Sequence, residues 1–196
     1  MPRKSLRDLN DGVATKVVPD SEPVPALLEW ARSQPQYSRS GKGGLRLVAP
    51  GLFLGNRQTA SDRELLRRHG IGAVVCVGAK PALQDLVCHH ISVRDDSSQS
   101  LLGHFPGAME FFPKHLSSGV GVLVHCQGGV SRSPAVVLAY LLRHGGLSLA
   151  QSLEVLSLAH PGAKPRGIFL DGLVKLEAEI QAEGEWEKGG EADQDQ

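Results

Sequence analysis

The 196-residue sequence predicts an α/β domain with a central, mostly parallel twisted sheet of four to five strands flanked by helices. Two observations lead to this fold class. Apolar runs of strand length alternate with segments of helical periodicity, an order that places parallel strands between helices. The runs at 71–78 and 120–125 are almost wholly apolar, as a sheet covered on both faces requires.

The two ends of the chain differ from this pattern. Residues 1–43 mix charges with serine, glycine and proline, so we expect a flexible tail. Within it, "PALLEWARSQP" at 25–35 favours one short helix between two prolines. We expect the folded domain at 44–182. Residues 183–196 are acidic and nearly devoid of apolar side chains, which predicts a disordered C-terminal tail.

The domain opens with a predicted hairpin and helix. Residues 45–48 (LRLV) and 52–55 (LFLG) are mostly apolar and flank a Pro-Gly turn signal. A helix should follow over 61–70, because Ser61 and Glu64 have the spacing of a capping box. Gly70 stands where a helix C-terminal glycine is expected.

The middle of the domain continues the alternation. The run at 71–78 predicts a buried strand and residues 89–93 predict another. The segment 104–116 predicts a helix, but Pro113 inside it predicts a kink or an early end, because proline lacks a backbone donor. The buried stripe of this helix is expected to be Phe105, Met109, Phe112 and Leu116.

The last third predicts a strand at 120–125 and three helices. The first helix contains "AVVLAYLLRHGG" and ends in glycines. Ser148 and Gln151 predict a capping box for the second, which should stop at Pro161. The third helix carries an apolar stripe formed by Phe169, Leu173, Leu176 and Ile180.

The stretch "VHCQGGVSRSP" joins the apolar strand to the first of these helices through a glycine-containing loop. N–H groups in such a loop and at a helix start converge on an anion. Ser133 and Pro134 are the expected N-cap and first residue of the helix. The expected anion-binding residues are Gln127, Gly128, Gly129, Val130, Ser131 and Arg132.

Cys126 stands at the start of this loop. The helix dipole, the loop amides and Arg132 all favour a thiolate over a neutral thiol, which makes Cys126 a candidate nucleophile. The planar guanidinium of Arg132 can hold two phosphate oxygens at once.

Cys126, five intervening residues, Arg132 and Ser133 match the Cys-x5-Arg-Ser/Thr signature of cysteine-dependent protein tyrosine phosphatases. The sequence resembles the atypical dual-specificity phosphatases of that superfamily. The likeness covers roughly residues 45–181, including "APGLFLGN", "AYLL" and "PRGIFLDGL". It implies a protein phosphatase that hydrolyses phosphotyrosine and phosphoserine or phosphothreonine through a cysteinyl-phosphate intermediate, without cofactor or metal.

The resemblance also implies a general acid and base on a separate loop. In "HHISVRDDSSQS" the matching residue is Asp95, with its neighbour Asp96 as the competitor. Two adjacent aspartates taken alone indicate only a solvated loop, so the preference for Asp95 depends on the family register. Ser133 is expected to hydrogen-bond the sulfur when it leaves the phosphoenzyme.

The composition of the sequence argues against several classes of binding partner. Lys and Arg together equal Asp and Glu together at 21 each, so no basic excess favours nucleic acid. No apolar run is long enough to span a membrane. The three cysteines form no CxxC pair, which argues against zinc and for a reducing compartment. We therefore expect a monomer that acts on phosphoproteins in the cytoplasm, with the nucleus left open as a second location.

Two alternative functions and one hypothesis about the cysteines stay open at this point. The protein could be a phosphoprotein-binding scaffold with weak turnover, or a phosphatase for phosphoinositides, RNA ends or glucans. The loop interior "QGGVS" is uncharged, which favours phosphoproteins over strongly anionic lipids. Finally, Cys76 could form a protective disulfide with Cys126 under oxidation.

Overall fold

The computed structural model describes residues 24–34, 44–78, 80–96 and 98–192. These residues form one five-stranded sheet with the strand order β1-β2-β5-β3-β4. The strands are β1 (Arg46–Ala49), β2 (Leu52–Asn56), β3 (Ile71–Val77), β4 (Val87–Ile91) and β5 (Gly121–Cys126). Only β1 and β2 pair antiparallel within this sheet, so the predicted mostly parallel α/β fold is confirmed.

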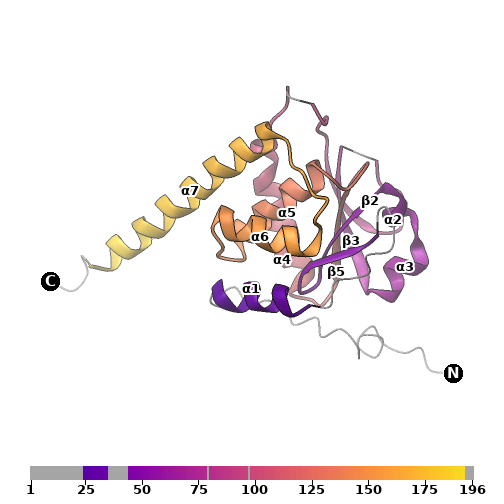
Figure 1. The fold of residues 1–196 in the computed structure, drawn as a ribbon, viewed down its shortest axis with the longest axis horizontal. Coiled ribbons are helices and arrows are strands. Elements are labelled where there is room, and N and C mark those ends of the chain that lie inside the picture. The colour runs from indigo at the N-terminus through magenta and orange to yellow at the C-terminus, as the bar shows by residue number, and fades with distance from the viewer. Residues whose placement is uncertain (1–23, 35–43, 79, 97, 193–196) are drawn as a thin grey trace.

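Helices cover both faces of the sheet, with α2 and α3 on one side and the larger helical layer on the other (Figure 1). The helices are α1 (Val24–Ser33), α2 (Arg57–Ser61), α3 (Arg63–Arg68), α4 (Phe105–Leu116), α5 (Arg132–Arg143), α6 (Leu149–Ala159) and α7 (Gly167–Ala192). A short 3-10 turn, η1 (Leu102–His104), precedes α4. Strand β5 lies in the centre, and every one of its residues is buried.

The capping residue of the first predicted helix differs from the expectation. Ser61 is the last residue of α2, and Asp62 caps α3, where its carboxylate accepts a 2.9 Å hydrogen bond from the Leu65 N–H. An additional short helix intervenes because the Asn56 side chain caps it through the Thr59 N–H. The capping-box prediction for Ser61 is therefore wrong by one residue, and Asp62 provides a carboxylate that suits a helix N-terminus.

Helix α4 does not end at Pro113 but continues to Leu116, so of the kink or early end predicted there, the early end does not occur. Proline removes the donor that would bond the carbonyl of Met109, one turn earlier. The ring Nε2 of His144, at the end of α5, lies 2.9 Å from that carbonyl oxygen and replaces the missing donor. The predicted stripe of α4 is buried as expected.

The later helices follow the sequence closely. The capping box of Ser148 and Gln151 is present at the start of α6. Of the stripe predicted for α7, Phe169 and Leu173 are fully buried. Helix α7 runs to Ala192, in contrast to the disordered tail expected from residue 183.

The predicted N-terminal helix is also present, as α1. Its Leu27 is buried in the larger core, and Arg32 forms an ion pair with Glu154 of α6. The rest of the expected flexible tail, and residues 193–196, lie outside the described residues.

Candidate active site

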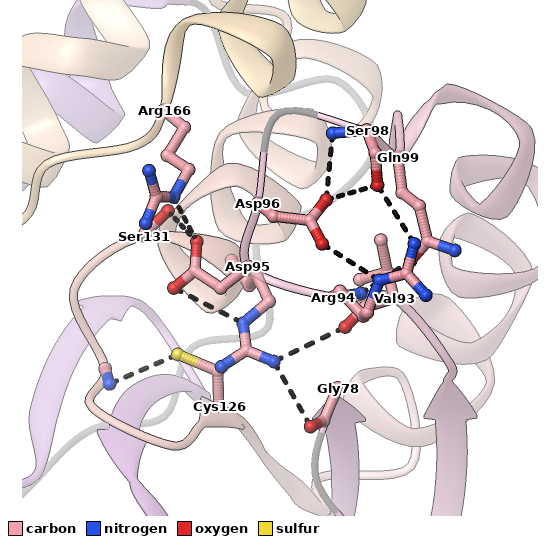
Figure 2. A network of polar contacts seen from close by, with 12 residues as sticks. Gly78, Val93, Arg94, Asp95, Asp96, Ser98, Gln99, Cys126, Ser131 and Arg166 are labelled. Carbon is pink, nitrogen blue, oxygen red and sulfur yellow. Dashed lines mark hydrogen bonds and ion pairs between the residues drawn. The ribbon is translucent and has the colours of Figure 1, made fainter.

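The carboxyl ends of three parallel strands place the predicted site residues together. Strand β5 ends at Cys126, the carbonyl of Gly78 follows β3, and Asp95 lies on the loop after β4. Ligands of open α/β sheets bind at this edge. The predicted nucleophile Cys126 and general acid Asp95, which lie 31 residues apart in the sequence, therefore meet in one place (Figure 2), and Arg132 forms an ion pair with Asp95.

Helix α5 begins two residues earlier than expected. Its N-cap is Ser131 and its first residue is Arg132, so the predictions of Ser133 as N-cap and Pro134 as first helical residue are wrong. Proline is tolerated in this first turn, since its missing N–H would have no partner within the helix. The earlier start turns Arg132 and Ser133 inward, and both side chains are buried.

The sulfur of Cys126 is buried and accepts two hydrogen bonds. The Ser133 hydroxyl donates at 3.1 Å and the Gly129 N–H at 3.2 Å. Burial is the largest single influence and raises the pKa of this thiol, but hydrogen bonds from Ser133 and Gly129 and the charge of Arg132 together outweigh it. The net pKa of Cys126 is lower than that of an ordinary thiol, as a nucleophilic cysteine requires.

The loop after Cys126 turns its carbonyl groups away from the sulfur. The carbonyl oxygen of Gln127 accepts from the Arg57 N–H at 3.3 Å, and that of Val130 accepts from the Lys164 N–H at 2.6 Å. Gly129 has a φ of +71°, and a Cβ there would lie 2.8 Å from the Gly55 carbonyl oxygen. With these carbonyls bonded outward and the Gly129 N–H bonded to the sulfur, the other loop N–H groups are left for an anion beside Cys126.

Arg132 is held in place by backbone carbonyls. Its Nη1 donates to the carbonyl oxygens of Gly78 at 3.2 Å and Val93 at 3.3 Å, while its side chain is only about 10% exposed. Its Nε lies 3.5 Å from Asp95 Oδ2 and is buried without a hydrogen-bond partner. This buried donor thus lies beside the carboxylate of Asp95.

Asp95 and Asp96 point in different directions (Figure 2). Asp95 faces the loop of Cys126: its Oδ1 accepts from the Ser131 hydroxyl at 3.0 Å. Asp96 folds back on its own loop, where it accepts from the backbone and side chain of Ser98 and pairs with Arg94. Hydrogen bonds from Ser98 and the Arg94 partner lower the pKa of Asp96 to about 2. Asp96 is thus committed to a structural contact and Asp95 to the site.

Two residues of the site were not predicted from the sequence. Gly78 has a φ of +63°, and a Cβ there would lie 2.0 Å from Arg132 Nη1 and 2.2 Å from the Val93 carbonyl oxygen. Arg166 donates from Nε to Asp95 Oδ1 at 2.8 Å. Gly78 carried only the signal of a glycine at the end of a predicted strand. Arg166 stands in the family-like segment "PRGIFLDGL", but nothing in the sequence paired it with Asp95, which is 71 residues away.

An open pocket of about 690 Å³ adjoins the site. It is lined by Asp95, Val130, Ser131 and residues 164–168. The described residues hold no group of three or more His, Cys, Asp or Glu side chains that could bind a metal, and none of the described helices is long and apolar enough to cross a membrane.

The three cysteines are free thiols, and they divide between the two faces of the sheet. Cys76 pairs in register with His125 and belongs to the core under α2 and α3, whereas Cys126 belongs to the opposite core. The sulfur of Cys76 lies 2.9 Å from that of Cys88 and 3.3 Å from His125 Nε2. A Cys76–Cys126 disulfide would have to cross the sheet, so the structure argues against it.

Comparison with known proteins agrees with this geometry. Residues 52–179 match the model of the family "Dual specificity phosphatase, catalytic domain". Dual specificity protein phosphatase 22-B of Danio rerio is 35% identical over 148 residues, which cover 74% of this chain and 81% of that protein.

Solved structures show the same likeness. The crystal structure of human DUSP28 superimposes with a TM-score of 0.67 at 36% sequence identity. The match covers 70% of this chain and 95% of the DUSP28 chain. The human tyrosine phosphatase-like serine/threonine/tyrosine-interacting protein superimposes with a TM-score of 0.65 at 30% identity, over 68% of this chain and 95% of its own.

Proposed function

Because this chain belongs to the family of dual specificity phosphatase catalytic domains, we propose that it hydrolyses phosphotyrosine and phosphoserine or phosphothreonine in proteins, with Cys126 as the nucleophile. The observation that carries this proposal is the environment of Cys126. Its sulfur accepts hydrogen bonds from Ser133 and Gly129, and its pKa is lowered in a loop whose carbonyls are bonded outward.

In the first step the substrate phosphate binds to the loop N–H groups from Gln127 to Arg132 and to the guanidinium of Arg132. The thiolate of Cys126 then attacks phosphorus, and the bond from phosphorus to the substrate oxygen breaks. Asp95 gives its proton to that oxygen, since an unprotonated alkoxide or phenoxide leaves poorly. Arg132 stabilises the negative charge spread over the equatorial oxygens in the transition state.

In the second step water hydrolyses the cysteinyl phosphate. The Asp95 carboxylate takes a proton from the water, whose oxygen attacks phosphorus as the phosphorus–sulfur bond breaks. Cys126 leaves as a thiolate, which the Ser133 hydroxyl stabilises through the 3.1 Å hydrogen bond. Inorganic phosphate is released, and the protonated Asp95 and ionised Cys126 are ready for another cycle.

The substrate class follows from the chemistry of the loop and its rim. The loop interior from Gln127 to Ser131 has no charged side chain, and the exposed Val130 presents an apolar surface at the opening. This supports phosphoproteins over inositol lipids, which carry several phosphates. We further propose that the enzyme acts as a monomer in the cytoplasm, a reducing compartment that suits three free thiols.

Turnover and trapping test the proposal together. Wild-type protein should hydrolyse phosphotyrosine and phosphothreonine peptides faster than a phosphoinositide, and Asp95→Ala should retain labelled phosphopeptide without releasing phosphate. Asp96→Ala is the matched control and should turn over without retention. Strong retention by the wild type with hardly any phosphate release would instead indicate a binding scaffold.

A further inference from the structure

The segment that joins α6 to α7, residues 160–166, contacts both loops of the proposed active site. His160 Nε2 lies 3.2 Å from the Gly129 carbonyl oxygen, and the Lys164 N–H donates to the Val130 carbonyl. Two residues later, Arg166 donates to Asp95. The α6–α7 connector therefore fixes the loop of Cys126 and the loop of Asp95 relative to each other.

The two carboxylate oxygens of Asp95 have different surroundings (Figure 2). Oδ1 accepts from the Ser131 hydroxyl at 3.0 Å and from Arg166 Nε at 2.8 Å. Oδ2 lies 3.5 Å from Nε of Arg132, the proposed phosphate clamp. Each carboxylate oxygen offers about two lone-pair sites, so Oδ1 is fully used while Oδ2 faces the phosphate site.

We propose that Arg166 is a positioning residue which, together with Ser131, holds Asp95 with Oδ2 directed at the substrate's leaving oxygen. This inference rests on the proposed function and extends it to one atom. An Oδ1 that already meets two donors cannot carry a proton toward them, so the proton of the acid form resides on Oδ2. From Oδ2 it passes to the leaving oxygen, and Oδ1 keeps its two hydrogen bonds throughout the reaction.

The loss of Arg166 is expected to affect the reaction rate much more than the folding stability. Arg166 is about half exposed, with a side-chain exposure of 53%, and an exposed ion pair contributes only about 0–1 kcal/mol to folding. Displacing a catalytic group by about 1 Å, in contrast, costs on the order of 10²-fold in rate. Loss of Arg166 should therefore leave the fold almost unchanged and still impair proton transfer.

The test compares two aryl phosphates that differ in their need for an acid. Phenyl phosphate releases a phenoxide that must be protonated, and dinitrophenyl phosphate releases a stable anion. Arg166→Ala should lower kcat/KM for phenyl phosphate by roughly 10- to 100-fold. It should leave dinitrophenyl phosphate nearly unaffected, along with the unfolding midpoint and the competitive inhibition constant of inorganic phosphate.

Arg67→Ala is the matched control, because it removes an exposed arginine that pairs with a carboxylate, Glu64, on α3 and away from the proposed active site. Its rates should stay near those of the wild type for both substrates. Arg166→Lys keeps the charge without the Nε donor, and it should recover only part of the loss.

A double-mutant cycle decides whether Arg166 acts through Asp95. If it does, Arg166→Ala should cause no further loss in the Asp95→Asn background. An equal loss for both aryl phosphates, or a full additional loss beside Asp95→Asn, would overturn the inference and leave the proposed function standing. A wild-type protein that hydrolyses neither substrate would overturn both.

Discussion

Replacing Ser133 with alanine tests the thiolate on which the mechanism depends. The Ser133 hydroxyl donates to Cys126 Sγ at 3.1 Å and is fully buried, so no water can take its place without rearrangement. A hydrogen bond to a charged group contributes about 1.5–3 kcal/mol. The lower figure changes the ratio of thiolate to thiol about tenfold.

Ser133→Ala should therefore raise the pKa of Cys126 and slow its alkylation by iodoacetate at weakly acidic pH. The slowing should be about threefold to tenfold, because a more basic thiolate is also the stronger nucleophile and offsets part of the lost ionisation. At alkaline pH the Cys126 thiol is ionised in both proteins, so iodoacetate should alkylate the variant as fast as the wild type or faster. The two pH–rate curves are thus expected to cross.

The same variant should slow the second chemical step more than the first. Without the Ser133 donor the departing sulfur is a poorer leaving group, so rapid-quench kinetics should show a burst of product followed by a slower steady state. Ser152→Ala is the matched control: Ser152 is fully buried in α6, and its hydroxyl has no hydrogen-bond partner. Parallel pH–rate curves for wild type and Ser133→Ala, without any shift, would refute the assigned role of the hydroxyl.

The remaining predictions concern the other reactive side chains. Cys126→Ser should abolish hydrolysis of aryl phosphates while the unfolding midpoint stays close to that of the wild type; residual turnover above background would exclude Cys126 as nucleophile. Asp95→Asn should lower kcat for phenyl phosphate by roughly 10²- to 10⁴-fold, and Asp96→Asn should lower it far less, since its carboxylate serves its own loop. If the two variants exchange these effects, the acid is Asp96. Hydrogen peroxide should oxidise the 2.9 Å sulfur pair Cys76 and Cys88 to a disulfide, with two thiol hydrogens leaving in two molecules of water. Mass spectrometry that finds a Cys76–Cys126 link instead would contradict the separation of these residues by the sheet.

The regular elements were predictable because their signals are local. Alternating apolar runs located the sheet, and the pair Ser148 and Gln151 located the start of α6 to the residue. The same type of signal failed at Ser61, where two possible caps stand side by side and the extra helix α2 decided in favour of Asp62. At Pro113, where a kink or an early end was predicted, the helix does not end, since the group that replaces the missing donor comes from His144 at the end of another helix.

The residues of the candidate site likewise divide into those with a local signal in the sequence and those without one. Cys126 and Arg132 belong to one loop, so their spacing in the sequence was sufficient to pair them. The choice of Asp95 over Asp96 needed the family register and stays a prediction; the structure shows that Asp95 accepts a hydrogen bond from Ser131. Gly78 and Arg166 could not be found, because each matters only through a partner brought near by the arrangement of the strands and the α6–α7 connector.

The position at which α5 starts explains how residues 131–133 contact three different groups, namely the sulfur, the carboxylate of Asp95 and two backbone carbonyls. Had Ser133 been the N-cap, its hydroxyl would have been used to cap a backbone N–H one turn later. With the N-cap at Ser131, that hydroxyl is free to donate to Cys126 instead. Ser131 itself makes no side-chain cap and donates to Asp95, which leaves N–H groups of the first turn for an anion. With the helix start two residues earlier, one hydroxyl contacts the proposed nucleophile and one the proposed acid, while Arg132 between them reaches the carbonyls of Gly78 and Val93.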